Sequence, residues 1–401
     1  MKKNFSKPVT RCQISNSKNL KSLLFLGFLP PVNALRKIGS TLNEEITFPA
    51  ELLYCSKSKL VQLGCIVDKE ILFPYSYPYT SSTTKVLREN FAELYKHTNK
   101  IVNLNENDLI IDIGSNDGIA LNYYKIKNYK NFVGIEPAKN LCKIANKRGI
   151  KTINSYLNKE LSKKYSCSAD LVTASNVFAH NKNIKLLAKY LLSLLRKDGV
   201  LIIEVQYIID MLKKNLFDNI YHEHIHYWSL HSLNYLFKSL GSSIYKVEKI
   251  STHGGSIRCY IKKGIFTQNK SVKNLIKNEI RMKIRTIKTF INFSKKLKEK
   301  KNNFKKFLIN NSNKVIVGYG AAAKTSTLLN YLKISDNINF IIDDNILKQN
   351  RYIPGTSIKI VSKNKIKQNI DFLIVFAWNY FKEIKEKVNY AKKIISIRRF
   401  F

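Results

Sequence analysis

Apolar and polar positions between residues 81 and 265 alternate in a way that predicts strands and helices in succession. Four short apolar runs have the composition of buried strands, at 109–113, 132–135, 171–174 and 200–204. Helix-like segments separate them. This alternation favours βαβ units around a parallel sheet.

The flanking segments have different patterns. Residues 269–310 are polar, Lys-rich and free of Gly and Pro, which predicts helix. Apolar runs at 314–317, 338–342 and 372–375 then predict a second, smaller α/β unit. Residues 1–80 hold six of the eight prolines and only short apolar runs, which indicates irregular structure. We therefore predict three domains, 1–80, 81–265 and 266–401, without an internal repeat.

Charge changes this picture little. The 401 residues include 69 Lys and Arg against 28 Asp and Glu, a formal net charge of +41. The lysines are spread along the whole chain beside many Asn and Ile residues, and only 295–306 is a dense run. Nucleic-acid surfaces usually carry Arg or one basic stripe, so we expect no nucleic-acid partner. A nucleotide diphosphate fits the charge equally well.

Hydropathy and cysteine usage indicate the cellular compartment in which we expect the protein. No apolar stretch approaches the ~18 residues that a membrane span needs, and no membrane partner is expected. The six cysteines are scattered and do not form a disulfide framework. We expect a cytoplasmic protein.

The first motif that indicates chemistry is a strand that runs into a glycine-bearing turn, from Asp108 to Gly118. Gly114 and Gly118 allow the backbone to pass close to a ligand. The spacing lacks the close glycine pair that admits a pyrophosphate, so it suits S-adenosylmethionine (SAM) better than a dinucleotide. Glu136 ends the next strand, where a carboxylate grips ribose hydroxyls, and Asn176 follows a third strand at the same sheet edge. A purely structural strand–turn–helix is the alternative.

The second motif runs from Tyr221 to His231 and holds four of the seven histidines. His, Glu and Tyr side chains transfer protons near neutral pH. If the segment is extended, His222, His224 and His226 share one face, which would permit a metal site. Proton transfer, metal binding and structural packing all remain open from the residues alone.

The third motif is Gly318-x-Gly320-x-x-Ala323, followed by Lys324. It is a dinucleotide-type turn after a strand, and the next predicted strand leads to Asp343 and Asp344. The turn could hold NAD, or the diphosphate of a nucleotide-sugar at a helix N-terminus. A turn kept only for packing is the third interpretation.

In this order, the motifs resemble the nucleotide-sugar C-methyltransferase family, whose members methylate carbon 3 of thymidine-diphosphate (TDP) 4-keto deoxysugars. The segments that carry the resemblance are Ile113-Gly-Ser-Asn-Asp-Gly118, Gly134-Ile-Glu-Pro-Ala138, Asn176-Val-Phe-Ala-His180, Tyr221-His-Glu-His224, His253-Gly-Gly-Ser256, Gly318-Tyr-Gly-Ala-Ala-Ala-Lys324, Pro354-Gly-Thr356 and Trp378-Asn379.

The resemblance implies an α/β fold in three parts: a small N-terminal module of the zinc-binding type, a class I SAM-methyltransferase domain with a Rossmann-like sheet, and a C-terminal Rossmann-like domain that helps to hold the nucleotide-sugar. It also implies a monomer that uses SAM as cofactor and a nucleotide-diphosphate sugar as substrate. The SAM-binding residues that we predict are Asp112, Gly114, Asn116, Asp117, Gly118, Glu136 and Asn176.

The resemblance places the catalytic groups as well. His224 is the predicted base, Glu223 orients it or the substrate, and Tyr221 stabilises the enolate. His180 faces the site, and a tyrosine of the 75–79 stretch enters it, Tyr79 before Tyr77. The predicted substrate-binding residues are Tyr77, His253, Gly318, Gly320, Lys324 and Asn379.

One departure concerns the N-terminal module. The family has two Cys-x-x-Cys pairs there, a spacing that closes a tetrahedral zinc site. This chain reads Cys12-Gln-Ile-Ser15 and Cys55-Ser-Lys-Ser58, so each pair has lost its second thiol. We predict that structural zinc is absent and that packing alone holds the module. The loss also suggests a second function, a non-catalytic or altered relative in surface-polysaccharide biosynthesis. A nucleic-acid methyltransferase is a more distant alternative.

Overall fold

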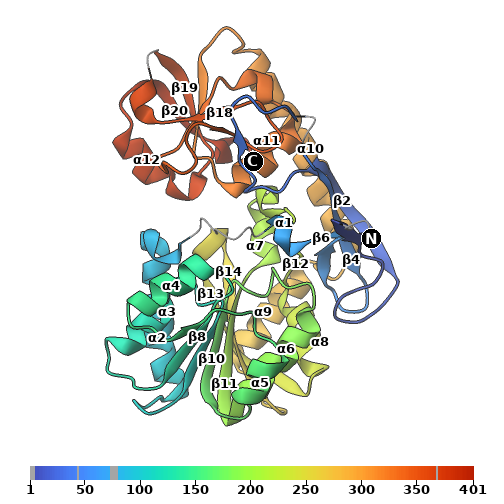
Figure 1. Cartoon of the computed structure of the whole chain (residues 1–401). Coiled ribbons are helices and arrows are strands. Elements are labelled where there is room, and N and C mark those ends of the chain that lie inside the picture. The colour runs from blue at the N-terminus through green and yellow to red at the C-terminus, as the bar shows by residue number, and fades with distance from the viewer. Residues whose placement is uncertain (1–4, 43–44, 73–79, 367–368) are drawn as a thin grey trace.

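The chain folds into two α/β domains that are joined on one side by a small β-rich module (Figure 1). The computed structural model describes residues 5–42, 45–72, 80–366 and 369–401. In these residues, no helix is long and apolar enough to cross a membrane.

The central domain contains a seven-stranded sheet in the order β13-β14-β11-β10-β7-β8-β9. The five strands from β11 to β9 are parallel, while β14 is antiparallel to both β11 and β13. The strands are β7 (Ile110–Ile113), β8 (Phe132–Ile135), β9 (Thr152–Ile153), β10 (Ala169–Ser175), β11 (Leu195–Gln206), β13 (Ser242–Ile250) and β14 (Ser256–Lys263). The four predicted strands and the parallel arrangement are confirmed.

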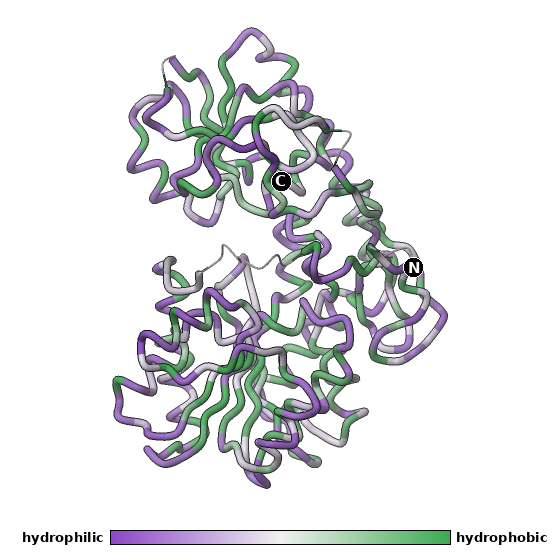
Figure 2. The backbone as a smooth tube through the Cα atoms, viewed as in Figure 1, coloured by the Kyte–Doolittle hydropathy of each residue, from purple (hydrophilic) through white to green (hydrophobic). Residues whose placement is uncertain are grey.

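Both faces of this sheet are covered, which explains the continuous apolar runs. Six of the seven residues of β10 are buried, and apolar residues follow the strands of the sheet in Figure 2. The covering helices include α2 (Lys85–Val102), α3 (Ile119–Lys125), α4 (Lys139–Lys147), α5 (Lys159–Lys164), α6 (Ile184–Leu194) and α8 (Leu230–Lys238), whereas α7 (Ile208–Lys213) lies beyond the end of β11 (Figure 1).

The predicted helix at 269–310 consists of two helices, α9 (Lys270–Arg281) and α10 (Ile287–Ile309). Lys283 adopts a left-handed backbone with φ +51°, which ends the first helix. The first of these helices packs against β13 and α8, so it covers the central sheet. The second contacts β2 of the N-terminal module, and this break lets one stretch of sequence serve two parts of the molecule.

The C-terminal domain contains a second seven-stranded sheet, in the order β20-β19-β15-β16-β18-β17-β3. Its first five strands are parallel. The bounds are β15 (Ile316–Tyr319), β16 (Ile341–Ile342), β17 (Arg351–Tyr352), β18 (Lys359–Val361), β19 (Ile370–Val375) and β20 (Ala391–Ser396), with helices α11 (Ala323–Leu332) and α12 (Phe381–Lys387). The predicted strands exist here, although two of them begin two to three residues later than predicted.

The prediction of irregular structure for residues 1–80 is wrong. This segment forms a two-stranded sheet and contributes three strands to a four-stranded antiparallel sheet, β12-β5-β4-β2. Among the described residues, Pro8, Pro30, Pro31 and Pro49 lie at or next to strand ends, where a missing N–H costs the sheet little. The bounds are β1 (Ser6–Pro8), β2 (Leu20–Leu29), β3 (Arg36–Lys37), β4 (Phe48–Cys55), β5 (Val61–Leu63), β6 (Cys65–Val67), α1 (Lys69–Leu72) and β12 (His226–Tyr227).

Two strand exchanges tie the three parts together. β3 of the N-terminal segment is the edge strand of the C-terminal sheet, and β12 of the central segment is the edge strand of the N-terminal sheet. The chain that leads into β12 carries the Tyr221 to His224 motif, so this motif lies where the three parts meet.

Candidate active site

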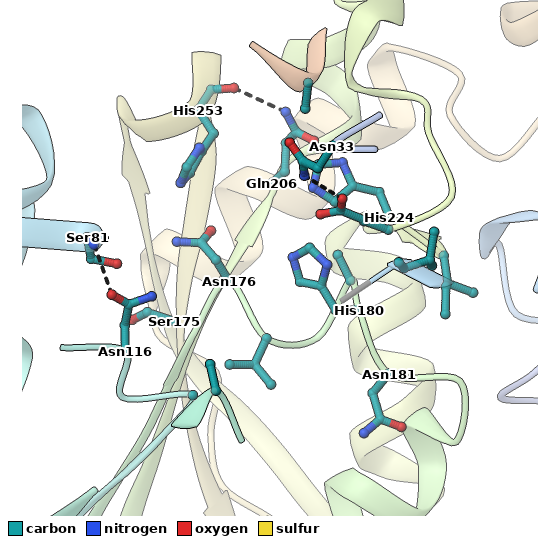
Figure 3. Close-up of a pocket in the computed structure, with 18 of the residues that line it drawn as sticks. Asn33, Ser81, Asn116, Ser175, Asn176, His180, Asn181, Gln206, His224 and His253 are labelled. Atoms are coloured by element: carbon teal, nitrogen blue, oxygen red, sulfur yellow. Dashed lines mark hydrogen bonds between the residues drawn. The ribbon is translucent and has the colours of Figure 1, made fainter. Parts of the chain in front are cut away.

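A cavity of about 1970 Å³ lies at the carboxyl ends of the parallel central strands. In open α/β sheets, ligands bind at this edge. All three parts of the chain contribute to its wall, for example Asn33 of the N-terminal module, Asn176 of the central domain and Trp378 of the C-terminal domain. Figure 3 shows the central part of this wall, with His180 between Asn176 and His224.

The turn after β7 forms one end of the cavity. Gly114 has φ +68°, and a Cβ there would lie 2.6 Å from the Val177 side chain, so only glycine fits. Asn116 is also left-handed, with φ +53°, and its side-chain oxygen accepts a hydrogen bond from the Ser81 N–H at 2.9 Å (Figure 3). Both residues line the cavity. The turn is thus fixed in a shape that brings backbone close to a ligand.

Glu136, at the end of β8, faces the same end of the cavity. Its two carboxylate oxygens accept hydrogen bonds from the N–H groups of Asn116 at 2.9 Å and Ala138 at 2.7 Å. Burial raises the pKa of this carboxyl, and the two hydrogen bonds oppose that shift. Each oxygen keeps a further lone pair that can accept a hydroxyl of a ligand.

The other predicted SAM-binding residues divide into two groups. Asp112 and Asn176 line the cavity. Asp112 accepts a hydrogen bond from the Thr173 hydroxyl at 2.6 Å, and burial raises its pKa to about 7. Asp117 and Gly118 do not line it. Asp117 is buried against Arg148 at 2.8 Å, and Gly118 packs on Ala145 and Ile150, so they support the turn from behind.

His224 and Tyr221 form a hydrogen-bonded pair in the cavity wall. Their ring centroids are 4.2 Å apart, and the Tyr221 hydroxyl lies 3.2 Å from Nε2 of His224. The other ring nitrogen, Nδ1, lies 2.8 Å from the carbonyl oxygen of Asn219. Because a carbonyl can only accept, Nδ1 carries the proton and Nε2 presents its lone pair.

Two further histidines face the same space. The His180 ring centroid lies 5.0 Å from that of His224, and His253 lines the cavity from the turn before β14. Burial lowers the pKa of His180 and of His253 to about 4 each, with the charge of Lys324 as a further cause for His253. Burial lowers the pKa of His224 well below its usual value, and His180, His253 and Lys324 add to this. All three imidazoles are therefore neutral at pH 7.

Glu223 is buried and points to the N-terminal module. Its Oε1 accepts a hydrogen bond of 2.6 Å from the side-chain amide of Asn33. Burial raises the pKa of Glu223 to about 7, and the bond from Asn33 opposes this shift. No sequence motif marks Asn33, and 190 residues separate it from Glu223, so this contact could not be predicted from the sequence.

The remaining histidines of the motif have separate structural partners. His222 bonds the Pro49 carbonyl, His226 lies between the Phe178 carbonyl and Gln13, and His231 pairs with Glu279. The segment is not extended, so the condition under which His222, His224 and His226 would share one face is not met: residues 222–223 form a turn, and of residues 221–227 only His226–Tyr227 is strand. Within the described ranges, no three His, Cys, Asp or Glu side chains are grouped so that they could hold a metal ion.

The glycine-rich turn after β15 does not face the cavity. A Cβ at Gly318 would meet Ile341 and Phe376, and one at Gly320 would lie 2.4 Å from Cβ of Ala377, so both glycines serve packing. Asp343 accepts a hydrogen bond from the Ala321 N–H at 2.7 Å and thereby closes the turn from inside. The helix that follows does reach the cavity, through Ala322, Ala323 and Lys324.

Lys324 presents a buried positive charge. Its ammonium has no hydrogen-bond partner among the residues that the structure describes, and it lies 4.6 Å from the ring centroid of Trp378. Burial lowers the pKa of this amine, and Asp218 opposes the shift. His253 and Asn379 line the same cavity. Tyr77 and Tyr79 lie outside the described residues.

The four positions of the family zinc site still converge in the N-terminal module. Sγ of Cys12 lies 3.1 Å from Oγ of Ser58, and Sγ of Cys55 lies 3.3 Å from Oγ of Ser15. A hydroxyl is a poor zinc ligand at neutral pH, so two thiols and two hydroxyls do not fit a structural zinc ion. Hydrogen bonds join the four side chains instead.

Comparison with known proteins agrees with this arrangement. Three family models match in succession: a zinc-binding domain over residues 12–73, a methyltransferase domain over 86–247, and a C-methyltransferase C-terminal domain over 251–395. C-methyltransferase NovU of Streptomyces niveus is 28% identical over 387 residues, which cover 94% of this chain and 92% of that protein. The chain belongs to the C-methyltransferase family. The family resemblance inferred from the motifs is thus confirmed, and the central domain has the class I SAM-methyltransferase fold.

Two solved structures are each similar to less than half of this chain. One is a chain from the complex of a methyltransferase and its activator from Haloferax volcanii. The match covers 44% of this chain and 92% of that chain, with 13% identity and a TM-score of 0.39. The other is a SAM-dependent methyltransferase from Thermotoga maritima. The match covers 43% of this chain and 97% of that chain, with 18% identity and a TM-score of 0.32.

Proposed function

We propose that this protein transfers the methyl group of SAM to carbon 3 of a nucleotide-linked 4-keto deoxysugar, with TDP as the nucleotide. The observation that carries the proposal is the His224–Tyr221 pair, in which the unprotonated Nε2 of the imidazole and the phenol hydroxyl lie 3.2 Å apart and both residues line one cavity. Family membership supports methyl transfer to carbon. The sugar and the nucleotide rest on the sequence resemblance and on the charges around the cavity.

The carboxyl edge of β7 and β8 fits SAM. Gly114 leaves room for close approach, and Glu136 has lone pairs for ribose hydroxyls. Asn116 and Asn176 supply further polar groups along the wall. When bound, SAM supplies a methyl group on a positively charged sulfur, which makes the methyl carbon electrophilic.

The opposite wall fits a diphosphate. Lys324 has a buried ammonium and stands in the first turn of α11, where the helix dipole also favours an anion. Lys214, Lys348 and Asn379 line the same cavity. Burying an ammonium without a partner is costly, and a bound anion would offset this cost.

The ketone at carbon 4 makes the hydrogen on carbon 3 acidic. In the proposed reaction, Nε2 of His224 takes this proton, and the C–H electron pair forms the enolate. The Tyr221 hydroxyl donates to the oxygen on which the charge develops, and neutral His180 lies beside it. The enolate carbon then bonds the methyl group, whose bond to sulfur breaks. Because His224 has a low pKa, enolate stabilisation has to supply much of the driving force.

Mass spectrometry of the purified protein would test this function. The protein is first mixed with SAM, and a TDP 4-keto deoxysugar is then added. We expect bound SAM and a sugar product heavier by one CH₂. SAM binding without product from any nucleotide-sugar would overturn the proposed substrate and favour the non-catalytic relative. No binding of SAM at all would overturn the proposed function as a whole.

A further inference from the structure

A short segment of the central domain packs against the C-terminal domain. It covers residues 215–219 and contains the single helical turn η3 (Phe217–Asn219). The Phe217 ring is buried, with centroids 5.0 Å from Tyr331 and 5.1 Å from Phe401. The Asn215 carbonyl accepts a hydrogen bond from Arg398 at 3.4 Å. The position of this segment therefore depends on C-terminal residues.

The strongest of these contacts is a buried hydrogen bond between Trp378 and Asp218. The indole Nε1 donates to Oδ2 of Asp218 at 2.8 Å, and Asp218 is only 3% exposed. Two cations flank the indole, since Lys324 lies 4.6 Å and Arg398 5.5 Å from its ring centroid. The positive charges of Lys324 and Arg398 thus hold the Trp378 indole in place. Its hydrogen-bond acceptor, Asp218, belongs to the central domain.

The residue after Asp218 holds the candidate base. The Asn219 carbonyl accepts the Nδ1 proton of His224 at 2.8 Å. We propose that the C-terminal domain positions His224 through Asp218, whose hydrogen bond from Trp378 fixes the Asn219 carbonyl. Asp218 does not line the cavity, so it is a positioning residue. The proposal deepens the proposed function, because it rests on His224 as the base.

Loss of this bond should be visible at His224 itself. Without Trp378 as donor, the 215–219 segment loses the contact with the C-terminal domain that lies next to Asn219, and the Asn219 carbonyl is free to shift. Nδ1 then loses its fixed acceptor, and the proton distributes between the two ring nitrogens. A ring that relaxes toward water also regains part of the basicity that burial had removed.

The test uses the full chain with ¹⁵N-labelled histidine and needs no substrate. Three variants are compared with the wild type: Asp218→Ala, which removes the acceptor, Asp218→Asn, which keeps an acceptor oxygen, and Trp378→Phe, which keeps a ring but loses the donor. NMR titration follows the tautomer and pKa of His224, assigned from the spectrum of His224→Gln. Asp170→Ala is the matched control, because Asp170 is 6% exposed and does not line the cavity.

We expect mixed tautomers and a higher His224 pKa in Asp218→Ala and Trp378→Phe, and near-normal signals in Asp218→Asn and Asp170→Ala. In turnover assays, kcat should fall at least tenfold in the first two while the Kd for SAM stays constant. An unchanged His224 in both Asp218→Ala and Trp378→Phe would overturn the proposal. If wild-type protein methylates no nucleotide-sugar, the proposed function fails, but the NMR result still decides whether Asp218 positions His224.

Discussion

At the scale of single residues, the site combines three neutral histidines with two carboxyls, Asp112 and Glu223, whose pKa values are raised to about 7. Burial is the largest cause of every one of these shifts. Since burial disfavours charge, the cavity keeps its histidines neutral at pH 7 and favours the protonated form of its carboxyls. Perturbed groups of this kind, gathered in one cleft, are typical of active sites.

His224→Gln should lower kcat by about 10²–10⁴-fold, the usual contribution of a positioned general base. The Kd for SAM should stay within a factor of about two, because His224 lies away from the turn after β7 that would hold SAM. Steady-state rates and calorimetric titration with SAM would measure the two quantities. His231→Gln is the control, since His231 pairs with Glu279 away from the cavity. Near-normal kcat in His224→Gln would assign the base to another residue.

Glu223→Gln should change how stability depends on pH. The pKa of Glu223 is raised to about 7, above the ~4.3 of an unfolded glutamate. Between these values the folded protein keeps a proton that the unfolded chain has lost, so the free energy of unfolding falls as pH rises through this window. The loss is on the order of 3 kcal/mol, and it should be missing in the variant.

Urea unfolding at about pH 4.5 and pH 7.5 would measure this difference for both proteins. The other titrating groups are shared, so their contributions cancel when the variant is compared with the wild type. Asn33 can still donate to the glutamine oxygen. If both proteins lose the same free energy over this pH range, Glu223 has an ordinary pKa.

At the scale of elements, the N-terminal module preserves two matched turns. Asn16 and Lys59, each four residues after a cysteine, have φ +58° and +60°. Their N–H groups donate to the carbonyls of Cys12 and Cys55 at 2.8 and 2.9 Å. The chain therefore keeps two matching turns at the positions of the family's Cys-x-x-Cys pairs, although two of the four side chains there are hydroxyls.

The double variant Ser15→Cys/Ser58→Cys should therefore bind one zinc ion per chain, because it supplies four thiolates in tetrahedral reach. At free zinc about 100 times above Kd, binding should stabilise the fold by about 2.7 kcal/mol. Elemental analysis and unfolding with and without a chelator would measure both effects. The wild type should show neither, and stoichiometric zinc in the wild type would contradict our prediction.

The strands show which elements can be predicted from sequence. All residues of β7 and all but one of β8 and of β10 are buried in a parallel sheet, so each strand is a largely apolar run that stands out locally. β2 is interrupted by register shifts between Ser22 and Leu24 and between Phe25 and Phe28, which blurs its alternation. β3 and β12 have two residues each and exist only through partners far along the chain. No local pattern can indicate such strands.

The candidate site shows the same limit. Motifs identified Gly114, Glu136, Tyr221 and His224, because each type of chemistry has a recognisable local spacing. Asn33 and Asp218 had no such signal, since their roles arise from contacts across 190 and 160 residues. Gly318 and Gly320 had a strong signal with another cause, the close packing of β15 against residues 341 and 376–377.

At the scale of the whole molecule, the N-terminal segment connects the two larger domains and contributes to both sides of the cavity. Asn33 bonds Glu223, and a few residues later β3 joins the C-terminal sheet. Arg36, within β3, donates to the Thr356 carbonyl at 2.6 Å and lies 3.1 Å from Glu45. Glu45 in turn accepts a hydrogen bond from the Gly355 N–H at 2.8 Å.

Arg36→Ala should therefore destabilise the protein strongly. The Arg36 and Glu45 side chains are 10% and 7% exposed, so the substitution leaves a carboxylate nearly buried and without its cation. Breaking such a pair costs about 3–5 kcal/mol.

Lys130→Ala is the control, because Lys130 pairs with Glu106 on the surface. Their side chains are 61% and 53% exposed, and an exposed pair contributes less than ~1 kcal/mol. Chemical unfolding would measure the free energy of unfolding of both variants. Equal losses of stability would mean that the Arg36–Glu45 pair does not hold the N-terminal segment against the C-terminal domain. A larger loss of stability in Arg36→Ala, accompanied by a fall in kcat, would mean that the Arg36–Glu45 pair also keeps Asn33 against Glu223. The contact between the N-terminal segment and the C-terminal domain would then support the active site as well as the fold.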